Sequence, residues 1–296
     1  MSYEELIRGK QTGVSTVRTT ETERPQAAYA LGHTPEEYER LRTQAQVWEV
    51  ATGRLLDDIR LEAGASCLDA GCGPGETMRA MAARVGPAGR VLGIDADPAL
   101  GAMTETMLHE AGHHQCSVQV HDISGAEPIP GAPFDLVYAR FLLFHLSERI
   151  NVVARLWDAV SPGGSLLVQD YDLRGVSTVP QLDWAPEVLR VFAGAFGAAG
   201  GDVSTGARLP QLFAQAGVGT PDGTDVTGRI EPLATGRFMV ESSFRSVLPT
   251  ALAHGVTTEA DAAATLASID RDAARFPDRP LLWPLLIGAW KRKGQT

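Results

Sequence analysis

The 296-residue chain is short of several residue types, and each shortage excludes a class of protein. It has only three cysteines, Cys67, Cys72 and Cys116, which cannot all pair with one another, so we expect reduced side chains packed in the interior. There are 26 basic residues against 36 acidic ones, and the resulting formal charge of −10 would repel a nucleic-acid backbone. The sequence therefore argues against a disulfide-stabilised scaffold and against a nucleic-acid partner.

Long apolar runs are also missing. The longest, Leu281–Trp290, is about half of a membrane span and contains Pro284, so we interpret it as a buried strand. Residues 1–20 mix charged and hydroxyl side chains without an apolar core, which fits neither a secretory signal nor a membrane anchor. We expect a cytoplasmic protein with no membrane partner. We expect no metal site either, since the cluster at residues 113–122 lacks the paired spacing of zinc ligands.

The composition is that of an ordinary globular protein, with 44% hydrophobic and 21% charged residues. Residues 1–27 show no periodicity and are predicted to form a mobile leader. Thr34 is followed by Pro35 and, three residues after the cap, by Glu37, and this capping box predicts a helix that runs through Trp48. With a second predicted helix at residues 52–60, this N-terminal helical segment covers residues 28–62.

From residue 66 onward, short apolar strands alternate with amphipathic helices, which is typical of a parallel sheet covered on both faces. The strands are predicted at residues 66–70, 90–95, 117–121, 134–139 and 165–170, and the helices at 76–85, 98–110 and 148–160. Ser147 is the predicted cap of the last helix, whose inward face includes Ile150 and Trp157, and residues 161–164 are predicted to form a turn. The pattern predicts an α/β fold with a doubly wound sheet.

After residue 172 the alternation loosens. Helices are predicted at 185–199 and 208–216, and residues 235–276 are mostly helical in pattern. We interpret the segments at about 173–205 and 235–276 as helical insertions over the carboxyl edge of the sheet. Residues 63–296 would then form one domain.

The first predicted strand runs into a glycine-rich turn, within the segment Cys67–Glu76. Gly71, Gly73 and Gly75 let the backbone approach a ligand where a side chain would collide, and the next helix presents free N–H groups. A dinucleotide-binding turn requires a third glycine where this chain has Glu76, which disfavours an NAD-dependent oxidoreductase. A zwitterionic ligand fits this carboxylate better than a pyrophosphate does, although Glu76 can also be explained as a first-turn helix acid.

Two further acids follow the next two strands. Asp95 lies 20 residues past Gly75, where its carboxylate can accept hydrogen bonds from both hydroxyls of a ribose. Asp97, before Pro98, is better explained as a helix cap. Asp122 ends the third strand and can accept a hydrogen bond from an exocyclic amine. The glycine turn and the two acids together indicate a nucleoside site.

Five segments resemble, in order and spacing, the motifs of class I S-adenosylmethionine (SAM)-dependent methyltransferases. They are CLDAGCGPGE, VLGIDADP, QVHDI, FDLVYARFLLFHL and SPGGSLLVQDYD. The resemblance is to the branch that includes ubiquinone/menaquinone-type and many actinobacterial natural-product enzymes, and it covers residues 40–172 well. It implies a Rossmann-like, mainly parallel sheet of seven strands, an N-terminal helical lid, SAM as cofactor and S-adenosylhomocysteine (SAH) as product.

The resemblance also implies which residues bind the cofactor. They are Asp69, Gly71, Gly73 and Gly75 for the methionine end, Asp95 and Ala96 for the ribose, Asp122 and Ile123 for the adenine, Ala139 and Arg140 for the path to the sulfonium, and Tyr29 and Gln44 in the lid. Asp69 can alternatively be explained as a cap of the loop.

Methyl transfer from a sulfonium is an in-line displacement, so positioning is the protein's main contribution. Where a base is needed, His145 is the first candidate, although it can also be explained as a helix-entry histidine bonded to backbone. Tyr171 and Tyr29 are further catalytic candidates. Asp170 and Asp172 are polar groups expected near the pocket.

Aromatic residues at the strand edges and in the predicted insertions indicate an apolar, roughly flat acceptor pocket. They are Phe141, Phe144, Trp184, Phe192, Phe196, Phe238 and Phe244. We predict a small aromatic or apolar natural product as the acceptor, with an indole carbon as one hypothesis and O- or N-methylation of a phenolic or quinone-type metabolite as an alternative. A non-catalytic SAM-binding regulator or partner subunit is an alternative of another class, and the protein could form a homodimer.

Overall fold

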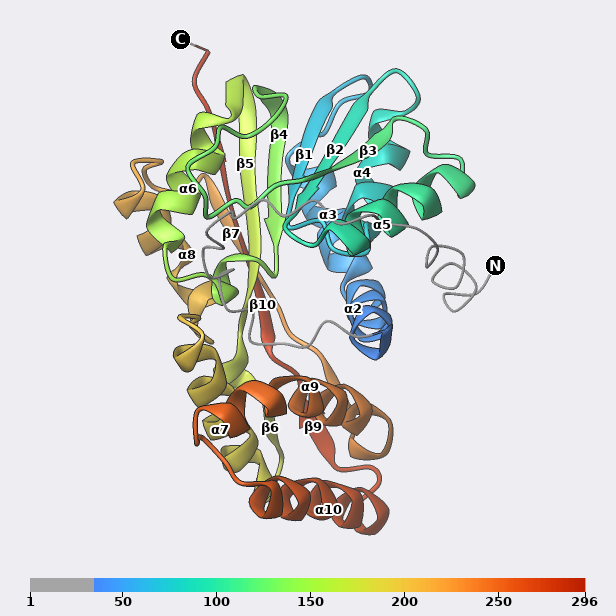
Figure 1. Ribbon diagram of the computed structural model, residues 1–296, viewed down its shortest axis with the longest axis vertical. Coiled ribbons are helices and arrows are strands. Elements are labelled where there is room, and N and C mark those ends of the chain that lie inside the picture. The colour runs from blue at the N-terminus through green and yellow to red at the C-terminus, as the bar shows by residue number, and fades with distance from the viewer. Residues whose placement is uncertain (1–34, 296) are drawn as a thin grey trace, which may run out of the picture.

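The computed structural model describes residues 35–295 (Figure 1). The predicted leader, the first residues of the predicted lid, Tyr29 and the capping residue Thr34 lie outside the described residues. The helix that Thr34 was predicted to begin is present as α2, Pro35–Val47, and α3, Glu49–Asp58, follows it.

A seven-stranded sheet forms the centre of the molecule, with the strand order β3-β2-β1-β4-β5-β10-β7. Its strands are β1 Ser66–Ala70, β2 Arg90–Asp95, β3 Cys116–Val120, β4 Phe134–Arg140, β5 Val160–Asp172, β7 Gly223–Thr227 and β10 Leu285–Arg292. The first five strands in this order are parallel, whereas β10 runs antiparallel to both β5 and β7. The predicted doubly wound, mainly parallel sheet is confirmed.

Helices cover the two faces of this sheet with separate hydrophobic cores. On one face α3, α4 (Glu76–Val85) and α5 (Pro98–Glu110) contribute Leu55, Met78 and Leu108 to one cluster. On the other face α6 (Arg149–Asp158) and α8 (Thr205–Gln215) contribute Leu156 and Phe213 to a second. Figure 1 shows these two groups of helices on opposite sides of the strands.

The helix starts show where local sequence was sufficient to predict a cap. The Asp97 side chain accepts hydrogen bonds from the backbone of Ala99 and Leu100, which confirms it as the cap of α5. The prediction for α6 was wrong, because the helix begins one residue later than expected, with Glu148 rather than Ser147 as its N-cap residue. Ile150 is consequently exposed rather than facing inward.

Strand β5 is longer than predicted, since residues 161–164 belong to it instead of forming a turn. The backbone N–H of Gly163 donates to the carbonyls of Lys293 and Gly294, and the N–H of Lys293 donates to Gly164. The segment therefore stays in the sheet because residues that follow β10 pair with it, which no local pattern reveals.

A second layer of structure, here called the cap lobe, lies beyond the carboxyl ends of the parallel strands (Figure 1). It consists of helices α7 Trp184–Ala198, α9 Leu233–Ala253 and α10 Glu259–Arg275 and a small sheet of β6 Ser177–Thr178, β9 Pro280–Leu282 and β8 Ile230–Pro232. These elements share a core of their own that includes Val188, Phe244 and Ile269. In the described part of the chain, no helix combines the length and the apolar character needed to cross a membrane.

The apolar run Leu281–Trp290 was predicted to form one strand, and this prediction was wrong. It divides at Trp283 and Pro284 into β9, which belongs to the small sheet, and β10, which belongs to the large one. Proline has no N–H to donate to a strand ladder, and the chain changes sheets at this point. The run therefore connects the cap lobe to the main sheet.

Candidate functional site

A cavity of about 870 Å³, here called the cofactor cavity, lies where β1, β2 and β4 end. The glycine turn forms one wall. A Cβ on Gly71 would come within 2.9 Å of Leu142, and one on Gly75 within 2.6 Å of Thr104, so neither position has room for a side chain. Both glycines also have positive φ angles, of 69° and 78°. Glycine at these two positions therefore suits both the backbone conformation and the close packing of the turn.

Asp69 ends β1 beside this turn and borders the cofactor cavity. Its side chain is buried, and its Oδ2 atom accepts no hydrogen bond within residues 35–295. Burial raises the pKa of Asp69 to about 7, although the charge of Arg140 acts in the opposite direction. A buried acceptor atom of this kind is costly unless a donor or a cation reaches it.

Asp95 and Asp122 border the same cavity. The carboxylate of Asp95 accepts hydrogen bonds from the backbone N–H of Gly73, at 2.9 Å, and of Asp97, at 3.0 Å, so it ties the glycine turn to β2. Burial raises its pKa. Asp122 accepts a bond from the N–H of Ser124. Because each carboxylate oxygen has two lone pairs, both acids retain capacity for ligand hydroxyl or amine groups.

The structure brings most of the predicted cofactor residues together. The cavity is lined by Gln44, Asp69, Gly71, Gly73, Asp95, Ala96, Asp122, Ile123 and Arg140. Two predicted residues do not line it: Gly75 packs under the turn against Thr104, and Ala139 is fully buried in the core below the sheet edge. Sequence reasoning missed Tyr38, which also borders the cavity and donates a hydrogen bond of 2.7 Å to Asp97.

A second cavity, here called the acceptor cavity, lies between the sheet edge and the cap lobe. It shares Leu41, Gln44, Phe141 and His145 with the cofactor cavity, so the two lie side by side. Its aromatic lining consists of Phe141, Phe144, Tyr171, Phe192, Phe196 and Trp283. Four of the seven aromatic residues predicted from the sequence therefore line it.

The other three predicted aromatic residues lie elsewhere. Trp184 and Phe244 are buried in the core of the cap lobe, and Phe238 is exposed to solvent. Trp283, by contrast, was missed, because it lies in the apolar run that was taken for one buried strand. Its placement depends on the change of sheets at Pro284.

His145 lies in the short helix η1, Leu143–His145, with its ring 5.3 Å from that of Phe196. Burial, with a smaller contribution from the charge of Arg40, lowers the pKa of His145 to about 3. The imidazole is therefore neutral at pH 7, and a group whose conjugate acid is so strong is a poor general base. Its backbone N–H donates to the carbonyl of Leu142, which closes the short helix.

Tyr171 borders the acceptor cavity from β5. Its hydroxyl oxygen accepts hydrogen bonds from Gln44 Nε2, at 2.8 Å, and from Trp48 Nε1, at 2.6 Å. Burial raises the pKa of Tyr171 to about 12, outweighing the opposite effect of these two bonds. The phenol is thus neutral at pH 7, and with two bonds already accepted its own O–H is left to act as a donor.

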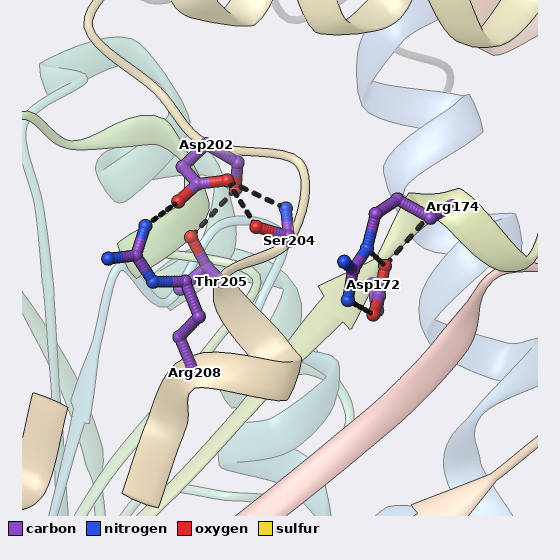
Figure 2. A network of polar contacts seen from close by, with 6 residues as sticks. All are labelled: Asp172, Arg174, Asp202, Ser204, Thr205 and Arg208. Atoms are coloured by element: carbon purple, nitrogen blue, oxygen red, sulfur yellow. Dashed lines mark hydrogen bonds and ion pairs between the residues drawn. The ribbon is translucent and has the colours of Figure 1, made fainter. Parts of the chain in front are cut away.

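The two neighbouring acids are engaged away from both cavities. Asp170 accepts hydrogen bonds from the backbone N–H of Phe144 and of Tyr171, each at 3.0 Å, and so holds η1 against β5. Asp172 forms an ion pair of 2.6 Å with Arg174, and Figure 2 shows this pair beside the separate Asp202 network. These two acids were expected near the pocket; they flank Tyr171, which lines it, but neither lines a cavity, and each shapes the chain at the end of β5.

The Asp202 network secures the connection between the cap lobe and the main domain. The Asp202 carboxylate accepts hydrogen bonds from Ser204 and from Arg208, at 2.7 and 2.8 Å, at the start of α8 (Figure 2). Within residues 35–295, no group of three or more His, Cys, Asp or Glu side chains is arranged to hold a metal ion. The three cysteines are buried and free.

Comparison with known proteins agrees with this geometry. Residues 67–164 match the family model described as a methyltransferase domain. Over 120 residues the chain is 35% identical to a trans-aconitate 2-methyltransferase of Paracidovorax citrulli, covering 40% of this chain and 44% of that protein. Over 153 residues it is 33% identical to the nocamycin O-methyltransferase of Saccharothrix syringae, covering 51% and 52%. The chain spans about half the length of these curated relatives.

The fold also matches solved structures. The YcgJ protein of Bacillus subtilis has a TM-score of 0.53 with 18% identity, and the comparison covers 83% of this chain and 100% of that one. This likeness concerns the fold alone. The matched segment, the seven-stranded sheet and the cavity at the glycine turn agree with one another: residues 67–164 match a methyltransferase domain.

Proposed function

We propose that the protein transfers a methyl group from SAM to a small, apolar or aromatic acceptor. The observation that carries this proposal is the adjacency of the two cavities, which share Leu41, Gln44, Phe141 and His145 as lining residues. A cofactor held at the glycine turn and an acceptor held under the cap lobe would meet at these four residues. Both parts of a group transfer thus have a place in one molecule.

The residues of the cofactor cavity fit SAM, which supplies an electrophilic methyl group when bound. Asp69 Oδ2, a buried acceptor atom, would receive the ammonium of the methionine end. The glycine turn would lie against the same end, Asp95 would bind the ribose, and Asp122 with Ile123 would border the adenine. Arg140 would border the path to the sulfonium; its Nη1 donates to Thr52, which holds the side chain in place, and its charge acts on Asp69.

The acceptor cavity provides flat apolar surfaces. The ring of Phe141 stacks on that of Tyr171 with centroids 4.2 Å apart, and Phe144 stacks on Phe196 at 5.0 Å. Such walls hold a planar molecule and exclude water from the line of transfer. We propose an aromatic natural product as the acceptor, and the relative that is named as a nocamycin O-methyltransferase supports small-molecule chemistry.

The weakness of the available bases limits which kinds of atom could be methylated. Neither His145, with its low pKa, nor Tyr171, with its high pKa, can remove a proton efficiently at pH 7. The acceptor would then be one that needs no base before attack. An ionised oxygen satisfies this condition, and so does an electron-rich carbon such as that of an indole, which loses its proton after the methyl group has been transferred.

The test is to incubate the protein with SAM labelled in its methyl group and with a panel of indoles, phenols, carboxylic acids and amines. We expect release of SAH together with label in an aromatic product, identified by mass spectrometry. Label found only on oxygen would exclude the indole hypothesis. SAM binding without SAH release across the panel would favour a non-catalytic SAM-binding protein. The Asp69→Asn variant serves as a control with an impaired cofactor cavity.

A further inference from the structure

Arg40 is a charged residue in the wall of the otherwise apolar acceptor cavity. It lies on α2 with only 6% of its surface exposed. Its Nη1 atom donates to Gln44 Oε1 at 3.1 Å and lies 3.5 Å from the hydroxyl of Ser243, on α9. The guanidinium thus lies between the lid helix and the cap lobe, where an acceptor would enter.

The charge of Arg40 affects the pKa values of two other residues that line this cavity. It adds to the effect of burial in lowering the pKa of His145. At Tyr171, where burial raises the pKa, it acts in the opposite direction together with the hydrogen bonds from Gln44 and Trp48. In surroundings of low polarity, such a charge favours an anion over a neutral molecule of the same shape.

Two further polar groups of the cavity can donate a hydrogen bond. Trp283 is 6% exposed, and within the described residues its indole N–H has no hydrogen-bond partner. The O–H of Tyr171 is left to donate, because its oxygen already accepts two bonds. None of the described residues that line the cavity is Asp or Glu. Donors without a carboxylate complement an oxygen that carries negative charge.

We infer that the acceptor carries an anionic oxygen, as a carboxylate or a phenolate, and that Arg40 is the residue that selects it. This inference rests on the proposed function, since it describes the acceptor of the same site. When the anionic oxygen is itself the nucleophile, its lone pair forms the new O–C bond while the C–S bond breaks and its electrons go to sulfur. An anion and a sulfonium become a neutral ether or ester and neutral SAH, and no proton has to be removed.

Binding to the SAH-loaded protein tests this inference without requiring turnover. Calorimetry would compare indole-3-acetate with indole-3-acetamide, and at pH 8 4-nitrophenolate with nitrobenzene. We expect the wild-type protein to bind at least one anionic member about tenfold more tightly than its neutral partner. In Arg40→Gln the affinity for that anion should fall by about 10- to 100-fold, while the affinity for the neutral partner changes little. Arg40→Lys should retain part of the preference.

The controls separate selection from folding. SAH binding by both variants serves as the control for folding, because Arg40 itself does not line the cofactor cavity. Arg54→Gln removes another arginine, which pairs with Asp225 on the surface, and should leave the anion preference unchanged. Product analysis then distinguishes an oxygen that is methylated from one that only anchors the acceptor.

Two results would overturn the inference. One is a wild-type protein that binds neither anion more tightly than its neutral partner, including one that binds neither at all. The other is an Arg40→Gln variant whose affinities for the anionic and the neutral member of a pair fall by the same factor. Failure of the proposed function would look different, because it would be an absence of methyl transfer whatever the binding preference.

Discussion

At the scale of single residues, Asp69 is a buried acid in the wall of the cofactor cavity. Burial holds its pKa at about 7, so the unliganded side chain is partly protonated at neutral pH. An ammonium group beside Asp69 would favour the carboxylate form. Small changes of pH around 7 therefore change the ionised fraction of Asp69.

SAM binding should therefore depend on pH through this residue. We expect the dissociation constant of SAM to fall as pH rises from 6 to 7.5, because more Asp69 is ionised while the α-amino group of SAM, which titrates near 7.7–8.0, stays largely protonated. In Asp69→Asn, binding should be about 10- to 100-fold weaker and lose this pH dependence. Calorimetry at the two pH values measures both effects. An unchanged pH dependence in the variant would show that another group is responsible.

Phe141 has an unusual backbone for its position between the two cavities. Its φ angle is 56°, in the left-handed region that favours glycine, and such strain costs about 1 kcal/mol or more. We expect Phe141→Gly to be more stable to denaturant than Phe141→Ala by about 0.5–1 kcal/mol, because glycine removes the strain while both variants lose the ring. Both should turn over the acceptor poorly. Equal stability of the two variants would mean that the backbone relaxes at little cost.

Residues of the cofactor site could be predicted from the sequence because they follow one another locally. Asp69 and the glycine turn lie on a single strand–turn–helix unit, and Asp95 ends the neighbouring strand. Arg40 and Trp283 could not be predicted, since neither has a motif around it. The Arg40–Ser243 contact joins residues 203 positions apart, and only the folded cap lobe brings them together.

At the scale of elements, α2 contributes residues to both cavities. Tyr38, Leu41 and Gln44 border the cofactor cavity, while Arg40, on the same helix, borders the acceptor cavity. We propose that α2 acts as the lid that was expected from the sequence. It would close over bound cofactor and carry the acceptor-binding arginine into place.

Hydrogen exchange measured by mass spectrometry tests this proposal. SAH should slow amide exchange in residues 38–47, because a ligand in the cofactor cavity stabilises the helix that borders it. The amides of α10 are the internal control, since no residue of that helix lines either cavity. Protection of α10 to the same extent, or none in α2, would mean that α2 is a fixed wall rather than a lid.

Elements with strong local signals were predicted to the residue. The bounds of β1, β2, α4 and α5 agree with those expected from periodicity, turn residues and the Asp97 cap. The extended start of β5 and the division at Pro284 were not predicted. Both depend on which distant strand pairs with the segment, and a hydrophobic run alone does not contain that information.

At the scale of the whole molecule, two buried acids influence how stability varies with pH. Burial raises the pKa of Asp69 and of Asp170 from an ordinary 3.8 to about 7. Between these values the folded chain binds more protons than the unfolded chain. The stabilisation from these groups is therefore complete below about pH 4 and is lost as pH rises through about 7.

The Asp69→Asn variant without ligand should reveal this effect. We expect its melting temperature to exceed that of the wild type at pH 8, where the wild type must bury a carboxylate, and the difference to shrink at pH 5. Thermal unfolding of both proteins at the two pH values measures it. A difference independent of pH would show that the charge of Asp69 is not the cause. At pH 8 we thus expect Asp69→Asn to be more stable than the wild type and yet to bind the cofactor less tightly.

The position of β10 determines when the molecule can become active during synthesis. β10 lies between β5 and β7, and within the described residues β7 pairs with no other strand. A ribosome makes residues 285–292 after both of these partners, so until then β5 presents an open edge and β7 has no place in the sheet. Trp283, in the wall of the acceptor cavity, is made just before β10. A nascent chain would thus form its cofactor cavity early, but its acceptor cavity would be completed only after residues 283–292 have been made.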